Sequence, residues 1–291
     1  MTLSSYAVIT PARNEVERIG KTIDSMVHQT LLPAVWVIVD DGSSDGTTAL
    51  VQAAMERHSW IRLVRRPDRG GRKPGGGVVE AFYDGYRLVK DLRWDYLVKL
   101  DADVTFGNEY FKSCIGHFQM DPTLGIGGGT ICVIRAGKTK VESPGDPPFH
   151  VRGATKIYRR RCWQEIEPLV QAPGWDTIDE VKANMRGWAT RTFAELPLIQ
   201  LKGTGTADGV WRNWFKNGRG CYVTGYDPMF MLAKCLKRSL AQPPVLPGLA
   251  LAAGFCSGYI EGLPRVPERQ VIRYLRRQQR HRMLFLPSIY R

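Results

Sequence analysis

Strand-like runs alternate with helical patterns along the first half of this chain, and this alternation constrains the fold more than any other feature. The strand-like runs cover residues 6–10, 35–39, 61–64, 96–100 and 125–134. Apolar residues recur at helical spacing at residues 14–28, 47–57, 78–90 and 109–118. This alternation favours a mostly parallel, doubly wound α/β sheet. The second half is less regular; its pattern predicts helices near 163–188, 211–218, 229–239 and 269–283 and a strand at 193–202.

Polar and acidic residues stand where three of the expected strands end. They are Thr10 after the first strand, Asp40 and Asp41 after the second, and Asp101 and Asp103 after the fourth. Ligands of open α/β sheets bind outside the carboxyl ends of the strands. We therefore expect these oxygen-bearing side chains to meet at one edge of the sheet.

The tripeptide Asp101-Ala102-Asp103 is a candidate metal site. Two carboxylates one residue apart can bind a hard cation such as Mg²⁺ or Mn²⁺, and such a cation can bridge and neutralise a diphosphate. A solvated turn is the alternative interpretation of so short a motif. The position of the tripeptide directly after an apolar strand favours its interpretation as a metal site.

Two further segments carry candidate ligand contacts. In residues 40–47, a strand-end carboxylate can accept a hydrogen bond from a base N–H or a ribose hydroxyl, whereas Asp45 and Thr47 are better interpreted as caps of the next helix. In residues 10–15, Arg13 beside a helix N-terminus favours an anionic or nucleotide ligand. Glu15 has the alternative role of a first-turn helix residue.

Three motifs, TPARNE at residue 10, VDDGSSDGT at 39 and LDAD at 100, stand in this order and spacing. Together they resemble the inverting nucleotide-sugar glycosyltransferases of family 2, which have the GT-A fold, over roughly residues 6–230. The resemblance implies a Rossmann-like half that binds the nucleotide sugar (about 1–104) and a half that binds the acceptor and carries the base (105–240). It also implies a hexosyltransferase with Mn²⁺ or Mg²⁺ as cofactor, and a donor that is a UDP-sugar by preference or a GDP-sugar.

The resemblance also assigns donor-site residues. The nucleoside pocket would be lined by Thr10, Pro11, Arg13, Glu15, Asp40 and Asp41, with Asp41 on the base. Asp103 would hold the metal, Asp101 the metal or the ribose, and Ala102 lies between them. Arg72 and Lys73 fall where family members often contact the donor diphosphate or sugar.

The catalytic base is expected in an acidic pair about a dozen residues before a Gly-Trp, which here is Gly187-Trp188. Asp176 lies twelve residues before Trp188, with Trp175 in place of the usual Glu. Asp179 and then Glu180 are the alternatives. Family relatives often have a His or a Gln-x-x-Arg-Trp motif further along, where this chain has residues 201–205 and Trp211-Arg212. The missing His argues against a third protein ligand to the metal and against a processive polysaccharide synthase.

The chain has 41 Lys+Arg against 28 Asp+Glu, a formal net charge of +13, which suggests a polyanionic partner. Basic residues cluster at 65–73, at 159–161 and at 265–282. The last cluster follows an apolar segment, residues 245–263, that is interrupted by Pro247 and Glu261 and is better suited to an interface than to a span. We expect residues 241–291 to form a helical extension at an anionic membrane surface, with a lipid-linked saccharide as acceptor. The alternative is a solvated charged face packed on the protein's own core.

Other functional classes fit less well. The six cysteines form no CxxC pair, so they predict core thiols in a reducing cytosol and no zinc site. No signal peptide is visible, and we expect a cytoplasmic protein on the inner face of the cell membrane. A sugar-phosphate nucleotidyltransferase would need a Gly-rich first loop. A nucleic-acid-binding protein would interleave aromatic with basic residues, so we expect no nucleic acid partner. A non-catalytic binding relative stays open.

Overall fold

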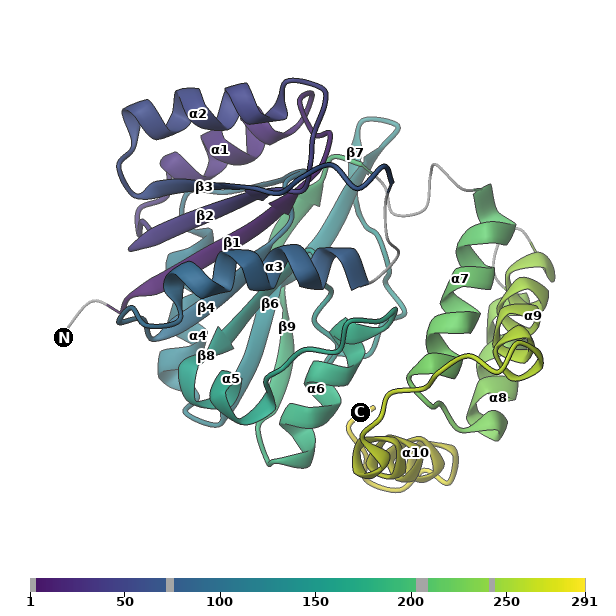
Figure 1. Ribbon diagram of the computed structural model, residues 1–291. Coiled ribbons are helices and arrows are strands. Elements are labelled where there is room, and N and C mark those ends of the chain that lie inside the picture. Colours follow the sequence, from purple (N-terminus) through teal and green to yellow (C-terminus); the bar gives the residue numbers. More distant parts are fainter. Residues whose placement is uncertain (1–3, 72–75, 203–208, 241–243, 291) are drawn as a thin grey trace.

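The computed structural model describes residues 4–71, 76–202, 209–240 and 244–290. These residues form one nine-stranded sheet with helices on both faces, and a separate layer of helices beside it (Figure 1). The strands are β1 (Tyr6–Ala12), β2 (Val35–Asp40), β3 (Ile61–Arg65), β4 (Tyr96–Leu100), β5 (Val104–Phe106), β6 (Leu124–Arg135), β7 (Lys138–Val141), β8 (Thr155–Arg159) and β9 (Ala189–Gln200). The helices are α1 (Ile19–Val27), α2 (Thr47–Arg57), α3 (Gly76–Val89), α4 (Tyr110–Met120), α5 (Arg160–Ile166), α6 (Trp175–Met185), α7 (Gly209–Val223), α8 (Pro228–Ser239), α9 (Leu246–Ile260) and α10 (Arg269–Met283).

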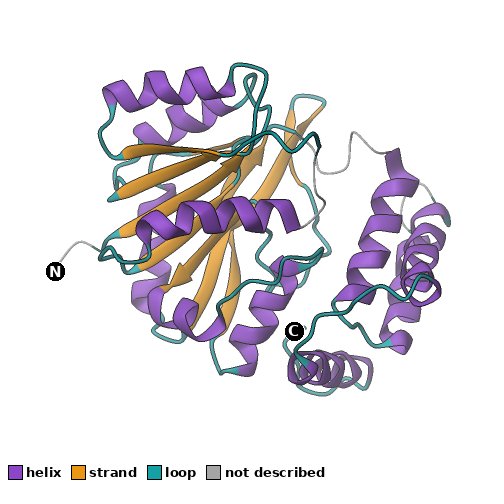
Figure 2. Cartoon of the chain, in the orientation of Figure 1, coloured by secondary structure: helices purple, strands orange, loops and turns teal. Residues whose placement is uncertain are grey.

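The sheet has the order β3-β2-β1-β4-β8-β6-β9-β5, with β7 paired to β6. Strands β3, β2, β1 and β4 are parallel, as the alternation of strands and helices predicts. Strand β8 lies antiparallel between β4 and β6, so the sheet is mixed beyond β4, although β6 and β9 are again parallel (Figure 2). The parallel half therefore presents its carboxyl ends at one edge.

Alternate residues of each central strand face opposite layers of helices, because side chains on a strand alternate between the two faces. Tyr6 and Val8 of β1 pack in the cluster that contains α1, α2 and α4. Ala7 and Ile9 pack in the cluster that contains α3, α5 and α6. Burial on both faces explains why these strands are continuous apolar runs.

Three strands were not expected from the sequence. Strand β5 has only three residues, and all four residues of β7 are exposed and mostly polar. Strand β8 contains Lys156, a charged residue that is fully buried and pairs with buried Asp179. Neither alternation nor an apolar run marks such segments, so the pattern misses them.

Helices α7, α8 and α9 pack on one another, across position 240 where the sequence suggests a boundary. Glycines set the distance between α7 and α9: a β-carbon at Gly254 would lie 2.0 Å from the carbonyl oxygen of Phe215, and one at Gly218 would lie 2.1 Å from that of Leu251. Helix α10 packs against α6 and α8 through buried Val271 and Leu275. Among the described residues, no helix has the length and apolar character needed to cross a bilayer.

Candidate active site

The carboxyl ends of β1, β2 and β4 lie side by side, as expected from the sequence. Strand β1 pairs with β2 up to Ala12 and Asp40, and with β4 up to Ile9 and Lys99. The loops that follow these strands carry the first three motifs (Figure 2). The structure therefore brings Arg13, Asp41 and Asp101 to one edge of the sheet, through pairing that spans 90 residues of chain.

The loop after β1 is tied to the loop after β2. Asn14 has a φ of 54°, and its side-chain oxygen accepts a hydrogen bond from Ser44 N at 2.9 Å. The backbone N–H of Glu15 donates to Thr47 Oγ1 at 2.9 Å, and that of Val16 donates to Asp45 Oδ2 at 3.1 Å. Asp45 also accepts the N–H of Thr47, the first residue of α2, but neither residue is the cap expected: the N-cap position is Gly46, with a φ of 89° and no side-chain cap. These bonds fix the two loops relative to each other.

Two of the residues expected in the nucleoside pocket have structural partners. Thr10 is fully buried, and its hydroxyl accepts a hydrogen bond from the indole of Trp36 at 2.9 Å. Asp40 accepts hydrogen bonds from Ser43 N at 2.8 Å and from the hydroxyl of Thr48. The side chains of Thr10 and Asp40 therefore form hydrogen bonds within the protein, and neighbouring residues would make the contacts with a ligand.

Asp41 is the centre of an ionic cluster at this edge. Its carboxylate pairs with Arg66 at 2.5 Å and with Arg69, while Arg13 donates to the Asp41 carbonyl and pairs with Asp68 at 2.7 Å. Pro11 precedes this group, and Glu15 is buried nearby and pairs with Arg18 at 3.4 Å. Several guanidinium groups therefore lie beside the carboxylate of Asp41, the residue expected to contact the base of the nucleotide. Arg72 and Lys73 lie outside the described residues.

The segment Asp101-Ala102-Asp103 follows β4 directly. Burial, together with the neighbouring carboxylates of Asp101 and Glu15, raises the pKa of Asp103 to about 7, although Lys99 opposes the shift. Lys99, the last but one residue of β4, donates to Asp101. The carbonyl of Ala102 accepts a hydrogen bond from Thr22 at 2.8 Å, which holds the backbone between the two carboxylates.

A buried group of carboxylates that repel one another fits a divalent cation, because the cation would remove the repulsion. Within the described ranges, no group of three or more His, Cys, Asp or Glu side chains is arranged to hold a metal. Asp101 and Asp103 would therefore hold the ion with donor phosphate oxygens and water as the other ligands, which is the usual arrangement for Mg²⁺.

Asp176 reaches the same edge from the first turn of α6. The helix begins at Trp175 because Gly174 adopts a φ of 85°, which favours glycine. Oδ2 of Asp176 would lie 3.4 Å from a β-carbon at Gly153. The Gly153 carbonyl in turn accepts a hydrogen bond from Lys99 at 2.5 Å. A short chain of contacts thus connects Asp176 through Gly153 and Lys99 to Asp101.

Asp179 and Glu180, the other two candidates for the base, are fully buried. Lys156 of β8 lies between them, with its amino group 2.7 Å from Asp179 and 2.8 Å from Glu180. Tyr158 donates to Asp179 at 2.6 Å, and Glu180 accepts from His150 at 2.9 Å. Burial raises the pKa of Asp179 to about 7, although Lys156 opposes the shift. Of the three candidates, only Asp176 is partly exposed to solvent.

Lys99, Lys156 and Trp175 lie at this site, although no sequence motif identifies them as site residues. The amino groups of the two lysines lie 5.5 and 5.6 Å from the centre of the Trp175 ring, on which both make cation–π contacts. A lysine inside an apolar strand, as in Tyr96–Leu100, was the available signal for Lys99. Trp175 was noted only as a departure from the family pattern.

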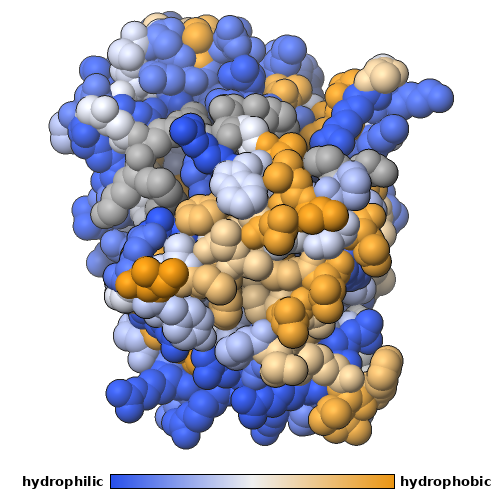
Figure 3. All heavy atoms as spheres, turned by 90° about the vertical axis from the view of Figure 1, so that its right-hand side faces the viewer, coloured by the Kyte–Doolittle hydropathy of each residue, from blue (hydrophilic) through white to orange (hydrophobic). Residues whose placement is uncertain are grey.

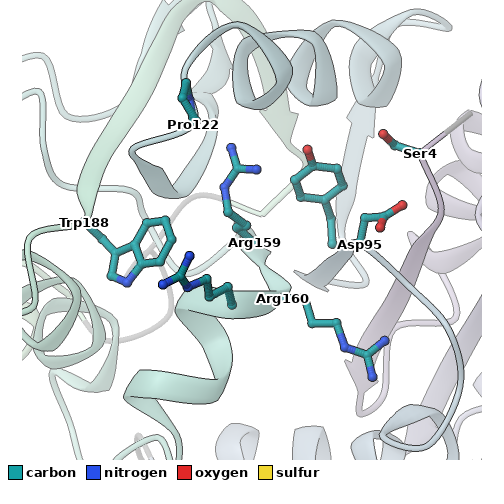
Figure 4. Close-up of a pocket in the computed structure, with 8 residues that line it drawn as sticks. Ser4, Asp95, Pro122, Arg159, Arg160 and Trp188 are labelled. Carbon is teal, nitrogen blue, oxygen red and sulfur yellow. The ribbon is translucent and has the colours of Figure 1, made fainter. Parts of the chain in front are cut away.

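A separate pocket of about 660 Å³ opens at the amino end of β4, the opposite end of the sheet (Figure 4). Arg159 lines it, but its guanidinium already donates to the carbonyls of Phe118, Asp121 and Leu124. Arg160 likewise donates to the carbonyls of Leu92 and Trp94. The basic cluster at 159–161 thus mainly holds the backbone, and the candidate site remains at the carboxyl ends.

Comparison with known proteins identifies the family of this chain. A family model described as Glycosyl transferase family 2 matches residues 7–166, which is more than half of the 291 residues. The chain belongs to glycosyl transferase family 2. The matched residues include β1, β2, β4 and all three motifs.

Solved glycosyltransferase structures share the fold. A mannosyltransferase from Pyrobaculum calidifontis, in complex with GDP-Man and Mn²⁺, has a TM-score of 0.59 at 20% identity and covers 90% of this chain and 77% of its own. TarS 1-349 from S. aureus, in complex with UDP-GlcNAc, has a TM-score of 0.52 at 15% identity and covers 88% and 73%. These likenesses establish the GT-A fold that the sequence motifs imply.

Curated relatives match shorter stretches of this family 2 member. Poly-beta-1,6-N-acetyl-D-glucosamine synthase from Staphylococcus aureus is 29% identical over 112 residues, which is 38% of this chain and 25% of the relative. Chondroitin synthase from Pasteurella multocida is 25% identical over 118 residues, 40% of this chain and 11% of the relative. The chain thus spans a quarter or less of the length of these two synthases.

Proposed function

We propose that this protein is a metal-dependent, inverting glycosyltransferase that moves a sugar from a nucleotide-diphosphate donor to an acceptor hydroxyl. The observation that carries the proposal is that Asp176 lies beside Gly153, whose carbonyl accepts a hydrogen bond from Lys99, the partner of Asp101. A general base and a metal-binding pair are the two chemical elements that such a transfer needs. The donor is a UDP-sugar by preference, with a GDP-sugar as the alternative, since relatives of this fold were solved with either nucleotide.

The nucleoside would bind at the cluster around Asp41, with the segment from Thr10 to Glu15 and Asp40 forming the wall. Asp41 would accept a hydrogen bond from the base once it exchanges one of its arginine partners for the ligand. Arg72 and Lys73 would contact the diphosphate or the sugar. Mn²⁺ or Mg²⁺, held by Asp103 and Asp101, would supply positive charge for the leaving diphosphate.

Asp176 would accept the proton of the acceptor hydroxyl, because it is the one of the three candidate carboxylates of α6 that is partly exposed. The acceptor oxygen forms its bond to the anomeric carbon while the bond from that carbon to the diphosphate oxygen breaks. Attack from the face opposite the nucleotide gives inversion. Lys156, Asp179 and Glu180 are buried behind Asp176 and would fix the first turn of α6; Lys156 also donates to the Asp176 carbonyl.

We place the acceptor at the inner face of the cell membrane, as a lipid-linked saccharide in cell-surface or exopolysaccharide synthesis. The basic helix α10, which packs against α8, and the apolar helix α9 support this location. In this proposal residues 1–104 bind the donor, residues 105–240 bind the acceptor and carry the base, and residues 241–291 contact the membrane. Nucleic acid is not proposed as a partner.

A donor screen tests the reaction. UDP- and GDP-sugars are added with Mn²⁺ or Mg²⁺, and thermal shift and slow donor hydrolysis are measured. We expect one nucleotide class to stabilise the protein only when the metal is present, and Asp103→Ala to abolish that metal-dependent shift. Unchanged nucleotide affinity in Asp103→Ala would refute the metal site, and hydrolysis of no donor would refute the activity.

A further inference from the structure

Helix α8 carries two apolar stripes, and only one of them is buried. Met231 and Cys235 pack in the cluster of the helical layer. Met229, Leu232, Leu236 and Leu240 follow at helical spacing and are 64%, 54%, 63% and 86% exposed. A surface helix normally places polar residues on its outer side. The outer side of α8 instead presents a continuous row of large apolar side chains.

Helix α9 is arranged in the same way. Its glycines face inward: a β-carbon at Gly254 would collide with α7, one at Gly248 with α8, and one at Gly258 with Tyr222. Leu249 and Ile260 face outward and are 55% and 85% exposed, whereas Leu251 and Phe255 are buried in the cluster of the helical layer. The helix contains no charged residue. Small residues at the contacts with neighbouring helices and large apolar residues on the outer side are typical of helices that pack in lipid.

The two rows form one surface, which we name the apolar face: Met229, Leu232, Leu236, Leu240, Val245, Leu246, Leu249, Tyr259 and Ile260. Figure 3 shows apolar side chains gathered over the middle of this side of the molecule, with hydrophilic residues below them. A patch of this extent on a soluble protein marks an interaction site.

Helix α10 borders the apolar face with positive charge. Arg269, Arg273 and Arg277 recur every four residues and are exposed, so they form one row along the helix. No acidic residue interrupts α10, and exposed Leu284 and Phe285 follow it. Positive charge beside an apolar surface matches the phosphates and acyl chains of an anionic bilayer. A second copy of the chain would bring the same positive row and no complementary charge.

We propose that the apolar face of α8 and α9 docks on an anionic bilayer, with its side chains among the acyl chains and the arginine row of α10 at the level of the phosphates. This inference rests on the membrane location in the proposed function, and it does not depend on the sugar transfer. The carboxyl ends of β1 and β2 point toward the side on which α7–α9 lie (Figure 1). Docking would therefore bring the active edge near a lipid-linked acceptor.

Flotation of the full chain with vesicles tests the proposal. Vesicles of phosphatidylcholine alone, and with added phosphatidylglycerol, are used at low and high salt. We expect flotation with the anionic vesicles. The triple variant Leu236→Gln, Leu240→Gln, Ile260→Gln should lower the partition coefficient at least about tenfold at both salt concentrations, because insertion of apolar area is lost. The double variant Arg269→Gln, Arg273→Gln should mainly remove the component of vesicle binding that depends on salt and on phosphatidylglycerol.

The matched control is Met120→Gln with Ile134→Gln, which removes apolar side chains that are 75% and 60% exposed in the sheet domain. It should float like the unmodified protein. Equal flotation of the triple variant, or no flotation of the unmodified protein, overturns the proposal. The proposal is also overturned if the unmodified protein binds no vesicles and forms a dimer in sedimentation that the triple variant abolishes. Donor hydrolysis without vesicles separates the two proposals, since the triple variant should retain it.

Discussion

At the scale of single residues, the environments of three neighbouring carboxylates in α6 separate their roles. Asp176 is partly exposed near Gly153, whereas Asp179 and Glu180 are fully buried around Lys156. A base must reach the acceptor hydroxyl within hydrogen-bond distance. A carboxylate with buried cationic and phenolic partners cannot do so without first breaking those contacts.

We therefore predict that Asp176→Asn lowers turnover about 10²- to 10⁴-fold, the usual contribution of a general base. Donor binding should be unchanged, because Asp176 does not lie among the nucleoside contacts. Initial rates at saturating donor and a nucleotide titration measure the two quantities. Full activity in Asp176→Asn would contradict the assignment and return Asp179 to consideration.

Lys156 is predicted to be a stability residue. Lys156→Met leaves Asp179 and Glu180 buried without their shared cation. Loss of one member of a buried ion pair costs about 3–5 kcal/mol. Urea unfolding followed by circular dichroism measures the change. The control is Lys112→Met, which removes an exposed ion pair with Glu109 and should lower the free energy of unfolding by less than about 1 kcal/mol. Equal losses in the two variants would show that the buried ion pairs of Lys156 do not contribute more stability than an exposed pair.

The sequence alone could place the acidic residues of the edge and put Asp176 first among the candidates for the base, but it could not show that Asp179 and Glu180 are buried. Asp40, Asp41, Asp101 and Asp103 follow strands that the apolar pattern predicts correctly. These two carboxylates pair with Lys156, which lies on β8, a strand that the pattern misses. Lys156 comes from a distant strand without a recognisable hydrophobic pattern, so the sequence around Asp179 does not indicate this contact.

At the scale of secondary-structure elements, hydrophobic periodicity predicted where several helices and strands form, but not how all the strands are ordered in the sheet. Helices at 47–57 and 269–283 have the expected bounds, because apolar residues on one face define both. The long segment expected to be largely helical at 163–188 is two helices, α5 and α6, separated near Pro173 and Gly174 as the sequence suggests. The antiparallel insertion of β8 between β4 and β6 follows from no local pattern.

The close packing of α7 on α9 gives a prediction for these elements. Gly254→Ala would place a β-carbon 2.0 Å from the carbonyl oxygen of Phe215, so the two helices must separate. We expect a loss of about 1–3 kcal/mol, as for other overpacked sites. The control Gly116→Ala lies in α4 where nothing is within 4 Å, and it should stabilise the protein by about 0.5–1 kcal/mol. Unfolding in urea should thus give changes of opposite sign; the same sign in both would contradict the packing argument.

At the scale of the whole molecule, the excess of +13 separates into parts with different uses. Arg66 and Arg69 pair with Asp41 and Glu80 at the donor edge. Arg159 and Arg160 donate to backbone carbonyls at the opposite end of the sheet. The row on α10 points to solvent. The clusters are visible in the sequence, but their partners come from other elements, so only the fold distinguishes structural from available charge.

Stability of the whole molecule should depend on pH through His150, which connects the loop before β8 to α6. Burial alone would lower the pKa of His150, but the carboxylate of Glu180 at 2.9 Å raises it to about 9; Asp176 adds to the rise and Lys156 opposes it. The pKa of the unfolded chain is close to the ordinary 6.5. Since the folded state holds the proton more tightly, the stabilisation is complete below about pH 6.5 and is lost as pH rises through about 9.

We predict that the free energy of unfolding falls between pH 6.5 and 9 by less than about 3 kcal/mol from this residue, at about 1.4 kcal/mol for each unit of pKa. His150→Gln keeps a hydrogen-bond donor near Glu180 but does not titrate, so its curve should be flatter over this range. Urea unfolding at several pH values measures both proteins. The difference between the two curves isolates His150 from Asp179, whose raised pKa also lowers stability as pH rises. Parallel curves would mean that the proton on His150 does not contribute to holding this loop against α6.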